Sequence, residues 1–167
     1  MVRRLRSEAN IKLTIELVPD SSWYNNVRAL VSPEEWDRLR RTVYRQAKHR
    51  CEICGGVGPR HPVECHEVWR YEDGIQRLVR MIALCPACHE VKHIGFASTQ
   101  GRGDIALAHL AEVNGWSVDR AVVYLYRQAD VWEERSRVTW ELDVTALARY
   151  GVRHGAITRV KPRVKHE

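Results

Sequence analysis

The residues of this chain best suited to chemistry are two pairs of cysteines. Cys51 and Cys54 form one pair with two residues between them, and Cys85 and Cys88 form a second pair about thirty residues later. Each pair presents two sulfurs from one tight turn, so the four thiolates match a tetrahedral structural Zn²⁺ site. All four coordination positions of such a site are closed, so it stabilises the fold and performs no catalysis.

Histidines lie next to the second cysteine pair. His89 follows Cys88 directly, and His93 comes four residues later. Residues four apart on a helix project from one face, so their two imidazoles could share a metal. An isolated pair with this spacing is more often solvent-facing. The zinc, however, would bring the strand that carries His66 against this helix, so we expect the three histidines to lie close together.

Several elements must position these residues. Residues 11–17, "IKLTIEL", alternate apolar and polar, which predicts a half-buried strand. A helix is predicted to begin at a capping box formed by Ser32, Pro33 and Glu35. It is predicted to run to about His49, so that it ends directly before Cys51. The residues at helical spacing that would form its buried stripe are Trp36, Leu39, Val43 and Ala47.

The region between the cysteine pairs predicts a hairpin. Residues 51–58, "CEICGGVG", are a glycine-rich turn that can wrap a metal. Residues 62–71 and 75–84 are predicted as strands joined by a turn at 72–74, and a helix is predicted from Pro86 to about residue 97. The predicted order is therefore turn, strand, strand and helix.

The rest of the chain is predicted to be mainly helical. One helix is expected from 102 to a stop at Asn114 and Gly115, and another from Ser117 to about Arg137. Residues 138–144 are expected as a strand that could pair with 11–17. The predicted organisation is one compact unit: a strand and capping helix in 1–44, a metal domain in 45–100, a helical extension in 101–150 and a mobile basic tail in 151–167.

Composition favours an anionic partner. The chain has 27 Lys plus Arg against 21 Asp plus Glu, which gives a net charge of +6 and a pI near 9.3. It has no run of eighteen apolar residues, so no membrane span is expected. Five cysteines in a metal-binding spacing, without an apolar signal sequence, favour a reducing cytoplasm.

Residues 45–96, through "ECHEV" and "LCPACHEVKH", resemble the HNH or ββα-metal nuclease family in its variety with a four-cysteine zinc. The resemblance implies an α+β fold in which a small zinc-stapled ββα-metal core is flanked by helices, with a short sheet from the terminal strands. It also implies hydrolysis of DNA phosphodiester bonds with one further divalent metal such as Mg²⁺, Mn²⁺, Ni²⁺ or Zn²⁺.

The resemblance gives roles to individual residues. His66 matches the general base, and His89 and His93 match metal ligands. Phosphodiester hydrolysis needs a proton acceptor with a pKa near neutrality and a cation that stabilises charge on the phosphate, which an imidazole and a metal provide. Arg70 and Lys92 are expected to contact phosphates, although each could equally be an ordinary surface charge.

The chain departs from the family pattern at two positions. Arg80 stands where the family has its middle Asn, and it or Gln76 is expected to take over that catalytic role. Cys65 falls where the family has a metal-binding Asp or His, and its soft thiolate favours Zn²⁺.

Cys65 leaves an alternative open. Together with His66, His89 and His93 it could complete a second closed zinc site, although Cys65 and His66 point to opposite faces of a regular strand. Glu64, on the same face as His66, is then a possible oxygen ligand. A zinc-stabilised protein that binds nucleic acid or acts as an adaptor without cleaving is therefore the alternative function. The segments after residue 103 could position DNA or form a homodimer.

Overall fold

A computed structural model describes residues 10–23, 25–152 and 159–160. Its centre is a long antiparallel hairpin of β1 (Glu64–Glu72) and β2 (Ile75–Leu84). Asp73 and Gly74 form the two-residue turn with φ values of 52° and 74°. Positive φ at both positions is typical of the type I′ turn that matches the twist of paired strands. The predicted hairpin and its turn are therefore confirmed.

The sheet extends from β2 and not from β1. β3 (Glu141–Asp143) lies parallel to β2, and β4 (Arg159–Val160) is antiparallel to β3, which gives the order β1-β2-β3-β4. The predicted strand in 138–144 is confirmed as this short β3. Its predicted pairing with residues 11–17 is wrong, because β3 forms its ladders with β2 and β4.

Residues 11–17 alternate in burial as predicted but form no strand. Leu13 and Ile15 are buried. The backbone groups of Lys12 and Leu13 form hydrogen bonds with a side chain and not with a neighbouring strand. Asn114 Oδ1 accepts from the amides of Lys12 (2.9 Å) and Leu13 (3.2 Å), and Asn114 Nδ2 donates to the Leu13 carbonyl (2.9 Å). The side-chain amide thus takes the place of a partner strand.

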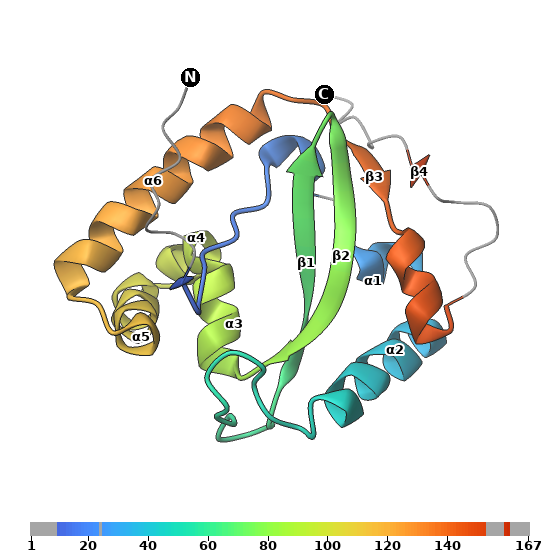
Figure 1. Cartoon of the computed structure of the whole chain (residues 1–167), viewed down its shortest axis with the longest axis horizontal. Helices are drawn as coiled ribbons and strands as arrows, with labels where there is room; N and C mark the ends of the chain where they lie inside the picture. The colour runs from blue at the N-terminus through green and yellow to red at the C-terminus, as the bar shows by residue number, and fades with distance from the viewer. Residues whose placement is uncertain (1–9, 24, 153–158, 161–167) are drawn as a thin grey trace.

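Helices pack against both faces of the hairpin (Figure 1). On one side lie α3 (Pro86–Lys92), α4 (Ile94–Thr99), α5 (Gly103–Asn114) and α6 (Val118–Ser136). On the other side lie α1 (Val27–Leu30), α2 (Pro33–Gln46) and the 3₁₀ helix η3 (Thr145–Tyr150). A further 3₁₀ turn, η2, spans Asp20–Ser22. The chain is therefore a mixed α+β protein, as expected.

The helix boundaries follow the predicted caps with two differences. Ser32 and Glu35 form the expected capping box, and Gly115 caps α5 in the left-handed conformation. The first difference is that α2 ends at Gln46, because Lys48 and His49 have positive φ values of 53° and 56°. The second is that the predicted helix from 86 to 97 is broken at His93 into α3 and α4.

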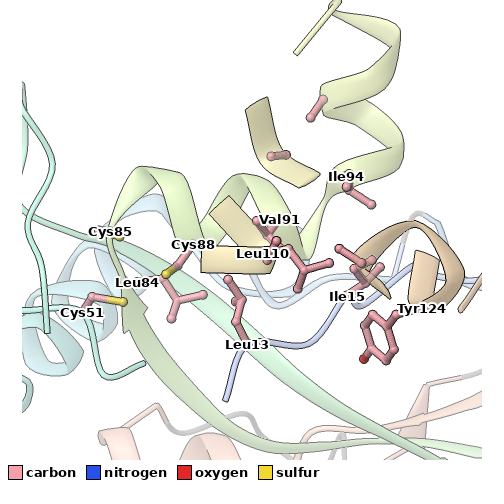
Figure 2. Close-up of a cluster of buried hydrophobic side chains, with 14 of the residues drawn as sticks. Leu13, Ile15, Cys51, Leu84, Cys85, Cys88, Val91, Ile94, Leu110 and Tyr124 are labelled. Atoms are coloured by element: carbon pink, nitrogen blue, oxygen red, sulfur yellow. The ribbon is translucent and has the colours of Figure 1, made fainter. Parts of the chain in front are cut away.

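Each face of the hairpin has its own apolar core. The core beneath α3 and α5 includes Leu84, Val91 and Leu110, and Figure 2 shows the sulfur atoms of Cys51 and Cys88 at its edge near the start of α3. The core beneath α2 and η3 includes Leu39, Val43 and Leu147. Within the part of the chain that the structure describes, no helix is long and apolar enough to span a bilayer. Most of the predicted basic tail, at 153–158 and 161–167, lies outside the described residues.

Candidate metal centres

The four paired cysteines converge on one point. Cys51 begins a turn in which its carbonyl accepts from Gly55 N (2.9 Å) and its amide donates to Gly56 O (2.9 Å). Cys85 caps α3 and Cys88 lies in its first turn. The four Sγ atoms lie within 4.8 Å of one another, with Cys54 and Cys85 3.6 Å apart. The predicted cysteine cluster is therefore present.

The electrostatics of this cluster favour a bound cation. A hydrogen bond from Cys88 lowers the pKa of Cys51 to about 4. The same bond raises the pKa of Cys88, and burial raises that of Cys85 to about 11. Once Cys51 is ionised, its negative charge makes ionisation of the Cys85 and Cys88 thiols unfavourable. A dication that binds all four sulfurs removes this cost, and this donor set fits zinc.

His109 adds a contact that the sequence did not reveal. Its Nε2 lies 3.3 Å from Cys88 Sγ, although the residue belongs to α5 and lies 21 positions further along the chain. A nitrogen that donates to a ligating sulfur orients the ligand and stabilises its charge. No spacing signal links His109 to the cysteine pairs, because packing of α5 on α3 creates the contact.

The three predicted histidines also come together. His66 projects from β1, His89 from α3, and His93 from the junction of α3 and α4. Their ring centroids are 4.8 to 5.3 Å apart, and one ligand nitrogen of each lies within 4.8 Å of the others. This histidine cluster could hold a metal ion.

Two of the three imidazoles already have a carboxylate on one ring nitrogen. His66 Nε2 lies 3.0 Å from Glu16 Oε2, and His89 Nδ1 bonds to Glu64. A histidine that ligates a metal usually donates its other nitrogen to such a group, which fixes the tautomer. In the tautomer whose proton lies on the nitrogen that faces the carboxylate, the other nitrogen of the ring is a lone-pair donor for a cation.

Burial of the imidazoles and hydrogen bonds to the carboxylates keep these groups in the forms that a metal needs. It lowers the pKa of His66, and together with the neighbouring imidazoles it lowers that of His93 to about 3. Although burial opposes its charge, bonds from His66 and Lys92 hold the pKa of Glu16 at about 2. The hydrogen bond from His89 likewise lowers the pKa of Glu64 to about 2. Neutral His93 and ionised carboxylates are therefore the neutral-pH state.

No family model matches the chain, and no curated protein or solved structure matches it either. The function therefore has to be inferred from the residues and their geometry.

Cys65 does not join the histidine cluster. It is half-buried against the core beneath α2, on the face of β1 opposite to His66. Burial raises the pKa of Cys65 to about 12, so its thiol stays protonated at neutral pH. The predicted metal contact of Cys65, and with it the closed four-ligand alternative, is not formed. Strand alternation is the physical reason.

Arg80 and Gln76, the predicted substitutes for the missing Asn, lie away from the histidines. Arg80 donates to both carboxylate oxygens of Glu52 at 3.2 and 3.3 Å, beside the first cysteine pair. Gln76 is fully buried in β2, and neither its amide nitrogen nor its oxygen has a hydrogen-bond partner among the described residues. The structure thus brings neither side chain into the histidine cluster.

The two predicted phosphate contacts differ in accessibility. Lys92 is 3% exposed, and its Nζ lies 2.7 Å from both Thr14 Oγ1 and Glu16 Oε1. This buried position does not suit a phosphate contact, so that prediction is corrected. Arg70, in contrast, is exposed on β1 and lines a surface hollow with Arg77 and Arg149.

A cavity adjoins the histidine cluster and is lined by residues that the sequence did not single out. Besides His66 and His93, its lining includes Glu67, Tyr71 and Arg135. Burial raises the pKa of Glu67 to about 7. A carboxyl group that titrates near neutrality is suited to accept a proton. Only the folded chain brings Arg135 here from α6.

A larger groove of about 590 Å³ includes His89 in its lining. α1 and α2 supply its basic and aromatic walls through Arg28, Arg40 and Tyr44, and β1 supplies Glu64. No ion-pair partner of Arg28 lies among the described residues, whereas Arg40 pairs with Asp37. The groove therefore presents one positive side chain that is unpaired among the described residues, Arg28, near a candidate metal ligand, while Asp37 in the same lining pairs with Arg40.

Proposed function

We propose that this protein is a metal-dependent endonuclease of the HNH type, built on a zinc-stapled ββα-metal core, that hydrolyses DNA phosphodiester bonds. The observation that carries the proposal is the convergence of His66, His89 and His93 from a hairpin and the helix that follows it. Carboxylates on two of these rings, from Glu16 and Glu64, support a metal-binding role. In addition, the arrangement follows the order of elements that the family resemblance implies.

The two clusters suit different metals. Four thiolates select zinc in a closed structural site. Three imidazoles leave coordination positions for other ligands, and imidazole suits Zn²⁺ or Ni²⁺, whereas Mg²⁺ prefers oxygen ligands. When bound, such a cation stabilises the charge that develops on the phosphate during hydrolysis.

Proton transfer falls to residues of the hairpin. Since Glu16 binds Nε2 of His66, only the other ring nitrogen is left, and it can either bind a metal or accept a proton from water. Glu67 lines the same cavity and is a second proton acceptor with a pKa of about 7. The two roles of His66 predict different effects of its removal on metal affinity.

DNA is the proposed substrate because aromatic rings and an arginine that is unpaired in the described part of the chain line a groove beside His89, and because the chain as a whole is basic. Arg28 and Arg40 stand on the groove that reaches His89, together with the aromatic rings of Trp36 and Tyr44. Guanidinium groups bind phosphates bidentately, and aromatic side chains can stack on bases. Since an HNH centre acts on one strand, a double-strand break would need two copies of the chain.

A second candidate function is nucleic-acid binding without cleavage. The observation that favours it is the position of Arg80. This residue stands where the family has its Asn, and its ion pair with Glu52 holds it away from the histidines. A protein of this kind would bind DNA with an affinity that falls steeply with salt, and it would leave the DNA intact.

A plasmid assay separates the two functions. Purified protein is incubated with supercoiled plasmid and Mg²⁺, Mn²⁺, Ni²⁺ or Zn²⁺, and His93→Ala is compared with the control His49→Asn, which alters an exposed histidine outside the cluster. We expect nicking by the wild type and the control and none by His93→Ala. Intact plasmid with every metal would refute the nuclease.

The role of His66 needs a second measurement. If His66 binds the metal, His66→Ala lowers both the cleavage rate and the affinity for Mn²⁺ measured by calorimetry. If His66 acts only as the base, the variant loses cleavage and keeps the Mn²⁺ affinity of the wild type.

A further inference from the structure

We infer that Arg135 is the residue that holds the phosphate of the substrate beside the histidine cluster. This inference rests on the proposed function and adds a residue outside the segment that carries the family resemblance. Arg135 belongs to the last turn of α6, 42 residues beyond His93 in the chain.

The position of Arg135 places its charge at the site. Its side chain lines the same cavity as His66 and His93. Any phosphate that contacts a cation held by these imidazoles lies within a few ångströms of them, as metal–oxygen distances are about 2 Å. A guanidinium that lines the same cavity as His66 and His93 can contact those remaining phosphate oxygens that extend into the cavity.

The guanidinium is free to bind an anion. Among the described residues, none of the carboxylates forms an ion pair with Arg135, whereas Arg80 is paired with Glu52 and Lys92 with Glu16. A partly buried guanidinium without a carboxylate can offer its paired N–H donors to a phosphate. Arg80 and Lys92, two of the three positive side chains that the sequence pattern offered, are thus occupied, whereas Arg135 has no carboxylate partner among the described residues.

Stacking fixes the orientation of Arg135. Its guanidinium carbon lies 4.7 Å from the centroid of the Tyr71 ring, which packs edge-on against Trp140 with centroids 5.1 Å apart. Trp140 Nε1 in turn donates to the Arg135 carbonyl at 2.8 Å. Such a cation–π contact holds the planar group without using its N–H donors. The arginine is therefore pre-positioned while its hydrogen-bonding capacity stays available.

The acidic groups of the cavity do not cancel this charge. Glu16 is bound by His66 and Lys92. Glu67 accepts hydrogen bonds from Val27 N at 2.6 Å and from Trp69 Nε1 at 3.3 Å. The hydroxyl of Tyr71 is buried without a hydrogen-bond partner in the described parts of the chain, so it is a further donor for a phosphate oxygen.

Phosphate binding tests the inference independently of cleavage. Inorganic phosphate is titrated calorimetrically into metal-loaded wild type, Arg135→Gln, Arg135→Lys and the control Arg127→Gln, which removes an exposed arginine from the same helix. Loss of a charge-assisted bidentate contact is expected to weaken binding by about 10- to 100-fold in Arg135→Gln. Arg135→Lys should recover part of the loss, and Arg127→Gln should bind like the wild type. Equal affinity of Arg135→Gln and wild type, or no phosphate binding by the wild type, would overturn the inference.

Cleavage kinetics distinguish the failure of the inference from the failure of the proposed function. If the wild type nicks plasmid, Arg135→Gln should lower kcat/KM by about 100-fold, and a kcat/KM within twofold of the wild type refutes the role of Arg135 while the nuclease stands. If the wild type does not nick plasmid but Arg135→Gln still loses phosphate affinity, the anion site stands and the nuclease fails.

Discussion

Replacing Lys92 by Met tests whether this residue stabilises the fold and does not contact DNA. Its side chain is 4% exposed, and its ammonium lies 2.7 Å from Glu16 Oε1 and 2.7 Å from Thr14 Oγ1. Removing one partner of a buried ion pair costs about 3–5 kcal/mol, because it leaves the other charge uncompensated. Glu16 is 28% exposed and keeps its bond to His66, so we expect a smaller loss of about 2–3 kcal/mol.

Urea denaturation of the metal-loaded protein, followed by far-UV circular dichroism, measures this loss. Lys12→Met is the matched control, since Lys12 is exposed on the same segment as Glu16, and it should change stability by less than about 0.5 kcal/mol. The double variant Glu16→Gln/Lys92→Met should lose less than the sum of the two single losses, because the two groups interact. An unchanged unfolding free energy for Lys92→Met, together with a fall in DNA affinity, would refute the buried pair and restore Lys92 as a phosphate contact.

Three further predictions concern the cysteines and the N-terminal segment. Cys85→Ser should lose both its bound zinc, measured by elemental analysis, and its cooperative unfolding transition. Cys65→Ser should retain one zinc per chain in the same analysis. Equal zinc in both variants would contradict the four-cysteine site. Because burial raises the pKa of Cys65 to about 12, Cys65 should be the one cysteine of the zinc-loaded native chain that reacts with a thiol reagent at pH 8, and it should react slowly. After chelation and unfolding, all five cysteines should react. Rapid reaction of Cys65 in the native chain would argue against its burial. Asn114→Ala should lower the unfolding free energy by about 2–3 kcal/mol, since it leaves backbone groups of Lys12 and Leu13 without partners, and thermal unfolding that matches the wild type would show that this segment is held in another way.

The sequence predicted those elements whose signals are local. The capping box at Ser32, the two-residue turn at Asp73 and Gly74, and the C-cap at Gly115 each depend on residues a few positions apart. The cysteine pairs were equally readable, because a tetrahedral metal fixes their spacing. Convergence of the histidines followed from the same reasoning, since the cysteine cluster joins the two ends of the hairpin.

The failed predictions involve contacts between distant segments. Alternation in residues 11–17 predicted burial correctly, but the partner is the side chain of Asn114 and not a strand. The break of the helix at His93 has a similar cause, because the Lys92 carbonyl accepts from Glu16 N at 3.2 Å and leaves the helical pattern. Tertiary competition for a backbone group leaves no mark in the local sequence.

The site residues that sequence reasoning missed share this property. Glu16 reaches His66 across 50 positions, and His109 reaches Cys88 across 21. Arg135 meets the histidine cluster only through the packing of α6. Arg80 and Lys92 were candidates through their proximity in sequence, but in the fold each has a carboxylate partner.

The most direct measurement of the central claim is the location of metal in crystals of the protein grown with Mn²⁺. Anomalous scattering at the zinc and manganese edges identifies each ion by element and position. We predict zinc among Cys51, Cys54, Cys85 and Cys88, and manganese bound by His66, His89 and His93. A zinc peak at the cysteines without any metal peak at the histidines, or the four sulfurs joined as disulfides, would contradict the account.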